Sequence, residues 1–388
     1  MSSSDTRPRV GLIVSKLAGL GGMELSSFRH VRLLSEKIAV IPISLEKSDR
    51  ESDWYGRVEQ ADCDGHPAYR ILASDFRVDQ VVGVMDVSQL SYVDQLVNIA
   101  RRERLSALHV YGAFERRPFV AAIAAIRLSL PLIITFRGSD LDLRIFGNHL
   151  AHLQAALRVA SACVCVNSSA QQVLRRLFNP TCPSFVIHNH VDPAEFDASA
   201  KAVLSCPRPI IGCVGEFRRL MGLDFLLQAF KRLAGRREAS LLLAGPFRRV
   251  EAMYYNHLTD TFKYSQRVYR TGAIKHSQIL AYMQACDVLV FPSISDGCPN
   301  KVLEAMLAGR AIVASDVGGI PELVRDGVDA VLVEPRDDEQ LLNALESLLD
   351  DPARARSLGE SARRRALSDF TPAVERAAWL QCYEEAGL

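Results

Sequence analysis

The sequence lacks the features that mark several large classes of protein. Its nine cysteines are an odd number and form no Cys-x-x-Cys pair, which argues against a disulfide framework and against a zinc site. The 46 Lys and Arg residues nearly balance the 45 Asp and Glu residues, so bulk charge gives no reason to expect nucleic acid as a partner. The longest apolar stretch, residues 118–136, is broken by Arg127 and Pro131, and no membrane-spanning segment is expected.

The start of the chain also lacks the apolar core of a signal peptide, and several cysteines, among them Cys163 and Cys165, lie inside apolar runs. Such cysteines behave as small buried hydrophobic residues, which is typical of a reducing compartment, so we expect a cytoplasmic protein. Two basic clusters, residues 101–104 and 116–117, allow two interpretations. They are either solvated helix ends or a peripheral contact with an anionic lipid or a phosphate-bearing acceptor at the inner membrane face.

The residues that are present favour an α/β protein of two domains. With 388 residues, 48% of them hydrophobic, the chain is roughly twice the length of a common domain and can bury a large core. Short apolar runs alternate with amphipathic stretches, which predicts parallel sheets covered by helices on both faces. The predicted strands are residues 10–15, 38–45, 107–111, 132–136, 163–166 and 185–188, followed by 210–214, 241–244, 288–291, 312–314 and 330–333.

A polar, proline-bearing segment at residues 191–209 separates the two series of strands and is typical of a linker. We therefore expect an N-terminal domain over residues 1–190, a second domain over 191–368, and a last helix within 369–388 that packs back on the first domain. Ligands of doubly wound sheets bind outside the carboxyl ends of the strands. The crevice between the two domains is thus the expected active site.

Two glycine-bearing turns follow the first strand of each series. The turn at residues 18–24 contains Gly21 and Gly22 but lacks the third glycine of a dinucleotide fingerprint, so a tight structural turn and a phosphate-adjacent loop are equally compatible with it. The turn at residues 214–222 places Arg218 and Arg219 just before a predicted helix. Two fixed guanidinium groups suit a diphosphate, and a solvated loop is the alternative.

The most informative stretch is residues 291–309, where a predicted strand leads through a loop into a helix that starts at Asn300. Asp296 lies on the loop, and Glu304 lies eight residues later on the helix. Free N–H groups at a helix start can hold a phosphate, and carboxylates accept hydrogen bonds from hydroxyl groups. One element can thus hold both the phosphate part and the sugar part of a ligand. Residues 316–322 supply another turn into a helix start.

The order of these motifs resembles the retaining glycosyltransferases of the GT-B fold, in particular glycosyltransferase family four (glycosyl transferases group 1). The matching segments are residues 21–22, 189–192, 214–222, 292–309 and 318–322. The resemblance covers nearly the whole chain and is strongest over residues 189–335. It implies two facing Rossmann-like domains with a cleft between them. It also implies the transfer of a sugar from a UDP- or GDP-sugar to an acceptor hydroxyl, with retention at the anomeric carbon and with neither metal nor cofactor.

The resemblance also implies roles for individual residues. Glu304 accepts the hydroxyls of the nucleotide's ribose, and Asp296 holds a hydroxyl of the transferred sugar. Gly21 and Gly22 let the N-terminal domain close over the diphosphate, while Gly215 belongs to the phosphate loop. The residues whose backbone is placed against the sugar and the diphosphate are Gly297, Cys298, Pro299, Asn300, Lys301 and Val302.

Three positions depart from the family's pattern. The first carboxylate is Asp296 where the family usually has Glu, so its reach is shorter by one methylene. The Lys that usually precedes the second glycine of the phosphate loop is Met221, and the Arg next to the first glycine is Glu216. Either Arg218 or Arg219 takes over the diphosphate, or donor binding is weakened.

On the acceptor side, Arg137 occupies the place of a His that lies near the reacting sugar in the family, and Asp140 follows it. We therefore count Arg137 with Asp296, Arg218 and Arg219 as a candidate catalytic residue. His109 ends an apolar run and either approaches the acceptor or is a satisfied core histidine. The neighbouring histidines of Asn189, at positions 188 and 190, either pack between the domains or contact a ligand.

The function expected from these features is a glycosyltransferase of polysaccharide, glycolipid or secondary-metabolite biosynthesis. Its acceptor is a carbohydrate, a lipid-linked sugar or a small molecule. Since Met221 and Glu216 remove or reverse two expected cations, a catalytically degenerate protein that binds a nucleotide sugar is the first alternative. An epimerase or a phosphorylase of the same fold is the second.

Overall fold

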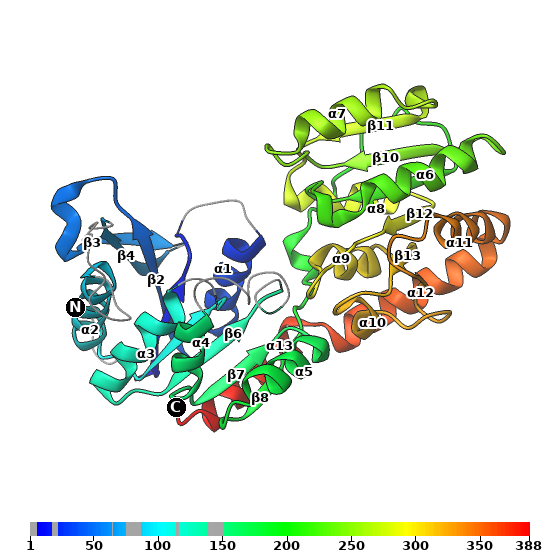
Figure 1. Ribbon diagram of the computed structural model, residues 1–388. Coiled ribbons are helices and arrows are strands. Elements are labelled where there is room, and N and C mark those ends of the chain that lie inside the picture. The colour runs from blue at the N-terminus through cyan, green and yellow to red at the C-terminus, as the bar shows by residue number, and fades with distance from the viewer. Residues whose placement is uncertain are drawn as a thin grey trace. The chain divides into compact units, whose positions relative to one another are not determined.

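A computed structural model describes residues 6–17, 22–63, 65–74, 87–113, 116–138, 141 and 150–388. The chain divides into two compact units, labelled by element in Figure 1. The first unit consists of Met1–Ile187 and Arg376–Leu388, and the second of His188–Glu375. Within the described ranges, no helix is both long and apolar enough to cross a membrane.

The first unit is built on an eight-stranded sheet in the order β3-β4-β2-β1-β5-β6-β7-β8. All neighbouring strands are parallel except β3 and β4, which form an antiparallel pair at one edge. The strands are β1 (Arg9–Val14), β2 (Ala39–Lys47), β3 (Arg57–Cys63), β4 (His66–Ala73), β5 (Ala107–Tyr111), β6 (Leu132–Phe136), β7 (Ala162–Cys165) and β8 (Ser184–Val186). The central strands β5, β6 and β7 are buried along their whole length, as a parallel sheet covered on both faces requires.

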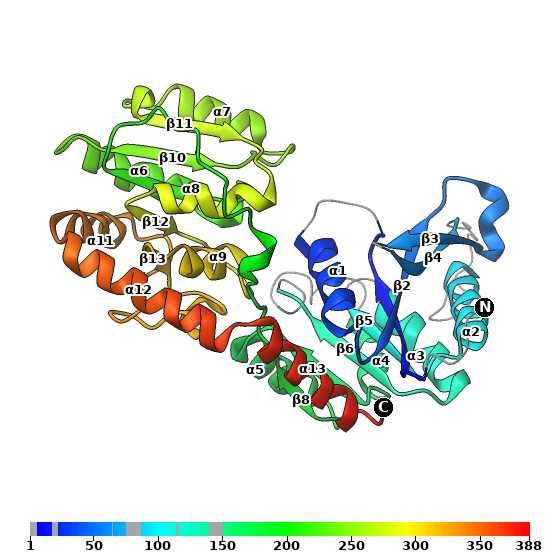
Figure 2. The same cartoon turned by 180° about the vertical axis from the view of Figure 1, so that it is seen from behind.

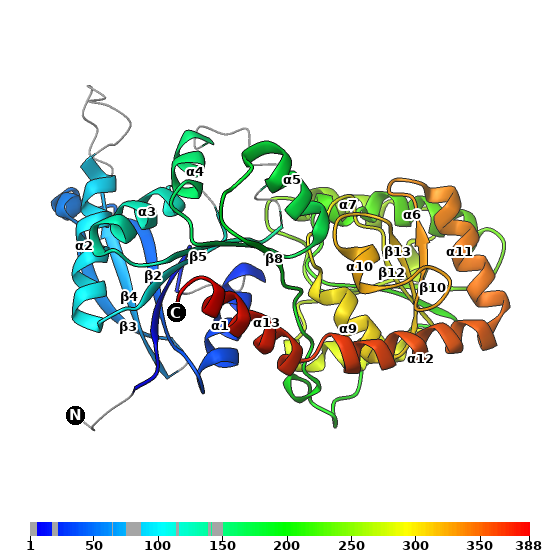
Figure 3. The same cartoon turned by 90° about the horizontal axis from the view of Figure 1, so that it is seen from below.

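Helices cover both faces of this sheet (Figure 3). They are α1 (Gly22–Leu34), α2 (Val87–Glu103), α3 (Arg117–Leu128), α4 (Leu150–Leu157), α5 (Ser168–Phe178) and α13 (Pro372–Glu385). One apolar core joins Ile13 of β1 with residues of α2 to α5, and the other joins Leu12 with α1 and with Trp379 of α13. Successive residues of a strand point to opposite faces, so β1 contributes to both cores.

The second unit has a six-stranded, fully parallel sheet in the order β11-β10-β9-β12-β13-β14. The strands are β9 (Ile210–Val214), β10 (Ser240–Ala244), β11 (Val268–Gly272), β12 (Val288–Phe291), β13 (Ala311–Ser315) and β14 (Val331–Val333). The chain builds outward from β9 to one edge and then returns to place β12 on the other side of β9. This reversal between β9 and β12 is the switch point at which ligands of doubly wound sheets bind.

The helices of the second unit also lie on both faces of its sheet. They are α6 (Leu223–Ala234), α7 (Ala252–Asp260), α8 (Ile279–Ala285), α9 (Asn300–Ala308), α10 (Ile320–Leu323), α11 (Asp338–Asp350) and α12 (Pro352–Asp369). α6 and α11 share one apolar core with the sheet, while α8 and α9 lie side by side, as Figure 2 shows. The start of α11 is set by Asp337, whose carboxylate accepts hydrogen bonds from the backbone N–H groups of Glu339 and Gln340.

Several sequence predictions can be compared with this architecture. The prediction of two Rossmann-like α/β domains is confirmed, and all nine cysteines are free thiols. The sequence did not predict the hairpin β3–β4 or the strand β11, because their polar and apolar residues are mixed without a continuous apolar run. The first unit resumes at Arg376, inside α13, so most of that helix belongs to the first unit.

Candidate functional site

The loop that follows β9 packs against the loop that follows β12. Gly222 has a φ of 69°, and a Cβ atom at this position would lie 2.0 Å from the carbonyl oxygen of Pro292, so only glycine fits. Nearby, the N–H of Ile294 donates a hydrogen bond of 2.8 Å to the carbonyl of Leu220. The two strand ends at the switch point are therefore joined by backbone contacts.

The loop after β13 completes the same region. Gly318 has a φ of 57°, and a Cβ atom there would lie 1.8 Å from the carbonyl oxygen of Asp296. The N–H of Gly319 donates to that same oxygen at 3.3 Å. Three strand-end loops thus fix the backbone of Asp296 just before α9 begins.

The side chain of Asp296 is paired with a lysine from the first turn of α9. The Nζ atom of Lys301 lies 3.1 Å from Oδ2 of Asp296 and 3.1 Å from Oγ of Ser293. Both side chains are largely buried, with exposed fractions of 16% for Lys301 and 14% for Asp296. The sequence predicted a role only for the backbone of Lys301, since spacing says nothing about where a long side chain points.

Glu304 lies one turn further along α9 and is 6% exposed. Its Oε1 atom is 3.1 Å from Nε2 of His276, and the ring of His276 packs on that of Phe196 with 5.2 Å between the centroids. His276 begins a short helical turn, His276–Gln278, after β11. No sequence motif points to this histidine, because only the fold brings it to Glu304 from 28 residues away.

The side chain of Asn189 is hydrogen-bonded to the loop that precedes α9 and to the first residue of that helix. Its Nδ2 atom donates to the carbonyl of Cys298 at 2.9 Å and to Oδ1 of Asn300 at 2.7 Å. The two histidines beside it have partners in the same unit: Nε2 of His188 is 2.8 Å from Glu322, and Nδ1 of His190 is 2.6 Å from Glu375. We infer that residues 188–190 fix the start of the second unit on the helix starts of α9 and α10.

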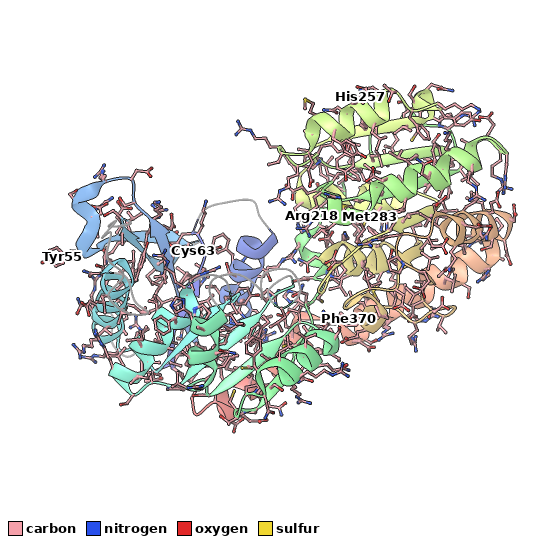
Figure 4. The ribbon with its side chains drawn as sticks, in the orientation of Figure 1. Tyr55, Cys63, Arg218, His257, Met283 and Phe370 are labelled. Atoms are coloured by element: carbon pink, nitrogen blue, oxygen red, sulfur yellow. The ribbon has the colours of Figure 1, made fainter. Side chains whose placement is uncertain are left out.

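The two arginines of the β9 loop are differently placed from Lys301. Arg218, labelled in Figure 4, is half-buried, and Arg219 is exposed at the start of the turn Arg219–Met221. The backbone N–H of Arg219 donates to Glu251 at 3.0 Å. Within the described part of the chain, neither guanidinium has an ion-pair partner. Both arginines therefore remain available to an anion.

The first unit contains a buried polar network around His109. Its Nδ1 atom is 2.6 Å from the hydroxyl of Tyr383, and its Nε2 atom is 2.6 Å from Oγ1 of Thr135. Burial lowers the pKa of His109 to about 3, and the charge of Arg137 adds to the shift, so the ring is neutral. Of the two interpretations of His109, the structure favours the satisfied core histidine over contact with an acceptor.

Arg137 lies directly after β6, at the carboxyl end of that strand, and is half-buried. Its guanidinium stacks over the ring of Tyr111, with 4.8 Å from Cζ to the centroid, and donates a hydrogen bond to Ser26. Gly22 is the first residue of α1. Gly21 and Asp140 lie outside the described residues.

No group of three or more His, Cys, Asp and Glu side chains that could hold a metal ion occurs in the described ranges. What the second unit does gather is a set of paired charged side chains at its switch point. Asp296 and Glu304 come from one loop and helix start, and each has a basic partner, Lys301 and His276 respectively. Such an arrangement can accept hydrogen bonds from hydroxyl groups while backbone N–H groups of α9 face an anion.

Comparison with known proteins supports the family that the motifs resemble. Residues 208–351 match the family model described as glycosyl transferases group 1, and residues 72–195 match the one described as glycosyltransferase family 4. A glycogen synthase of Mycobacterium tuberculosis is 30% identical over 301 residues, which span 73% of this chain and 69% of that protein.

Solved structures resemble the chain over nearly its whole length. A sucrose-phosphate synthase from Thermosynechococcus elongatus superposes with a TM-score of 0.77 at 20% identity, covering 98% of this chain and 99% of the other. The Anabaena protein HepE, solved in complex with UDP and glucose, gives a TM-score of 0.73 at 17% identity, with 97% and 100% covered. At such identities the likeness shows a shared fold.

Proposed function

The chain belongs to the family-four glycosyltransferases and has their GT-B fold, and from this premise we propose that it transfers a sugar from UDP or GDP to an acceptor hydroxyl with retention at the anomeric carbon. The observation that carries the proposal is the set of charged side chains at the switch point of the second unit. Asp296 and Glu304 are paired there with Lys301 and His276, and the backbone carbonyl of Asp296 packs against Gly318 so closely that a Cβ atom would not fit.

Each part of the donor has a matching group in this arrangement. One oxygen of Glu304 is bound to His276, so the other accepts the ribose hydroxyls. Asp296 accepts a hydroxyl of the transferred sugar, and the first N–H groups of α9 face the diphosphate. Asp is one methylene shorter than the usual Glu, so we expect the sugar to sit closer to the start of α9.

The reaction requires stabilisation of a departing diphosphate beside an oxocarbenium-like carbon. Donors that are already fixed stabilise this charge without reorganising during the reaction. Arg218 and Arg219 have no carboxylate partner among the described residues, which supports them as cations for the diphosphate. The leaving phosphate takes the proton of the acceptor hydroxyl, and the mechanism uses neither a metal nor a nucleophilic carboxylate. Arg137 is proposed for the acceptor side.

The comparisons indicate which ligands to try first. HepE was solved in complex with UDP and glucose, and another relative is called a glycogen synthase. UDP-glucose as donor and short glucans as acceptors are therefore the first combination to test. Carbohydrate, lipid-linked and small-molecule acceptors follow, with GDP-sugars as the second group of donors.

The test is a donor screen with UDP- and GDP-sugars in which transfer and hydrolysis products are identified by mass spectrometry. For the donor that is turned over, Glu304→Gln should lower kcat/KM by about 10- to 100-fold, because a charge-assisted hydrogen bond to the ribose is lost. The matched control is Glu360→Gln on the exposed face of α12, which should leave kcat/KM unchanged.

Two results would count against the proposal. If no donor is turned over and Glu304→Gln binds UDP and GDP as the parent does, the site is not where we place it. Binding of a nucleotide sugar without turnover would instead favour the degenerate binding protein, for which Met221 and Glu216 in place of basic residues are the specific observation.

A further inference from the structure

The space beside Gly215, at the end of β9, is shared by two side chains. A Cβ atom on Gly215 would lie 3.4 Å from Cε of Met221 and 3.8 Å from Cδ of Lys301. Met221 is 3% exposed and belongs to the apolar core under α6. Lys301 reaches the same place from the first turn of α9. The aliphatic part of the lysine thus packs where the end of the methionine side chain does.

The ammonium group of Lys301 is held in an unusual state for a lysine. Lysines are rarely buried, because removing the charge from water costs more than most pairings return. An ammonium has three N–H donors, and the described part of the chain supplies two acceptors, Asp296 and Ser293. One donor is left over at the strand end, next to a glycine that presents no side chain.

We infer that Lys301 is the lysine that contacts the donor's diphosphate, in place of the one that the family carries at the position of Met221. The inference rests on the proposed function, since it assigns a residue to the same site. In the absence of donor, Asp296 neutralises the ammonium. When donor is bound, Lys301 contacts Asp296 and a phosphate oxygen together, so that it links the sugar-binding carboxylate to the leaving group.

Two features favour this role over that of a partner for Asp296 alone. The lysine is already packed and bonded to Asp296 and Ser293, so binding an anion costs little side-chain freedom. Its charge is also felt at the end of β9, where burial raises the pKa of Cys213 to about 12 and Lys301 opposes that rise. The ammonium therefore acts on the switch point and not only on the loop that carries Asp296.

The test exchanges the lysine between its two positions. We would measure the Kd of UDP and GDP by calorimetry for the parent, Lys301→Gln, Lys301→Arg and the double variant Lys301→Gln with Met221→Lys. Lys301→Gln should raise the Kd of the nucleoside diphosphate that the parent binds by about 10- to 100-fold. The double variant should recover most of that loss, because its ammonium reaches the same space from the β9 loop.

Uridine and guanosine, titrated by ligand-observed NMR, show whether the loss is confined to the phosphates. The Kd of the nucleoside should be unchanged in Lys301→Gln, and Lys301→Arg should bind the nucleoside diphosphate within a few-fold of the parent. Lys231→Gln on the exposed side of α6 is the matched control. Thermal unfolding of every variant shows whether it is folded. If the double variant is not folded, the difference in Kd between Lys301→Gln and Lys301→Arg decides whether Lys301 contacts the diphosphate.

The outcomes separate the two proposals. Unchanged binding of the nucleoside diphosphate by Lys301→Gln, or an equal loss for nucleoside and diphosphate, would overturn the role of Lys301 and leave the glycosyltransferase proposal standing. A parent protein that binds neither UDP nor GDP would instead remove the proposed function itself.

Discussion

The two units have the same kind of sheet but use their polar residues differently. In the first unit, His30, His109 and Tyr383 lie inside the core, where the tyrosine hydroxyl is hydrogen-bonded to both histidines. In the second unit, the notable polar pairs join α9 to the segments that follow β12 and β11: Lys301 with Asp296, and Glu304 with His276. The first set is neutral and internal, whereas the second contains two carboxylates and an ammonium and borders the switch point.

The difference follows from where each set has hydrogen-bonding capacity left. Both ring nitrogens of His109 are bonded to protein groups, so this residue has nothing to offer a ligand. Glu304 keeps one carboxylate oxygen, and Lys301 keeps one N–H, that no described residue occupies. In the first set, the Nδ1 atom of His30 has no hydrogen-bond partner among the described residues, but this residue is 1% exposed and enclosed in the core. Unused hydrogen-bonding capacity beside strand-end loops is suited to binding, whereas a network enclosed in a core stabilises the fold. We therefore assign a stabilising role to the buried set of the first unit and a ligand-binding role to the set of the second unit.

The sharpest way to test the binding role is to disturb the loop of Asp296 without touching its side chain. Gly318→Ala introduces a Cβ atom 1.8 Å from the carbonyl oxygen of Asp296, so the loop must move, and we expect kcat/KM for the donor to fall by about 100-fold or more. Gly327→Ala is the matched control, since Gly327 has a φ of 68° against 57° for Gly318 but no atom within 4 Å. Similar activity in the two variants would mean that the position of Asp296 does not matter.

The second largest effect is expected from acid, which should destabilise the first unit at a higher pH than the second. Burial lowers the pKa of His109 to about 3 and lowers that of His30 as well, so the unfolded first unit binds more protons than the folded one between pH 6.5 and 3. Its free energy of unfolding should therefore fall as the pH drops, by about 1 kcal/mol per pH unit for each histidine. In the second unit, burial raises the pKa of Asp329, but hydrogen bonds from Arg325 and Ser361 lower it by more, so the pKa is lowered overall. The loss of stability that comes from protonating Asp329 therefore begins only below about pH 4.

Urea unfolding followed by tryptophan fluorescence measures this prediction, because both tryptophans, Trp54 and Trp379, belong to the first unit. Circular dichroism reports on both units and serves as the reference. His109→Gln should reduce the pH dependence of the fluorescence transition between pH 6.5 and 4.5. A transition that does not move in this range would show that the buried histidines are not neutral.

The smallest expected effect comes from removing a single hydroxyl. Tyr383→Phe deletes the group that joins His30 to His109 and leaves both rings with one fewer partner, which should lower the free energy of unfolding of the first unit by about 1–2 kcal/mol. Binding of UDP and GDP by the second unit should be unchanged. A change in nucleotide affinity would contradict the separation of the two sets.

The sequence was sufficient for features that depend on local pattern. Continuous apolar runs predicted every described strand except β3, β4 and β11. The spacing of Asp296 and Glu304 around a helix start singled out the candidate site. Contacts that depend on folding were not accessible. His276 reaches Glu304 from another strand end, and Lys301 was noted only for its backbone, although its side chain forms the ion pair.

Burial in the last helix was hidden for the same reason. The sequence predicts a helix over residues 372–385, but nothing local tells which side of it is apolar, because small, charged and aromatic residues are mixed along it. The structure shows Trp379 and Tyr383 fully enclosed against α1 and the sheet of the first unit. Only the return of the chain to that unit explains why these two aromatic residues are there.

That return has a consequence for synthesis on the ribosome. The first unit needs Trp379, Cys382 and Tyr383 to fill one face of its sheet, yet these residues are translated after every residue of the second unit. Residues 188–375 are contiguous, so the second unit can fold as soon as it emerges. The first unit, although it is begun earlier, exposes an open apolar face until residues 376–388 have left the exit tunnel. The second unit can thus finish folding before the first, although the first is begun earlier. A chaperone that binds nascent apolar surface would find that surface on the first unit.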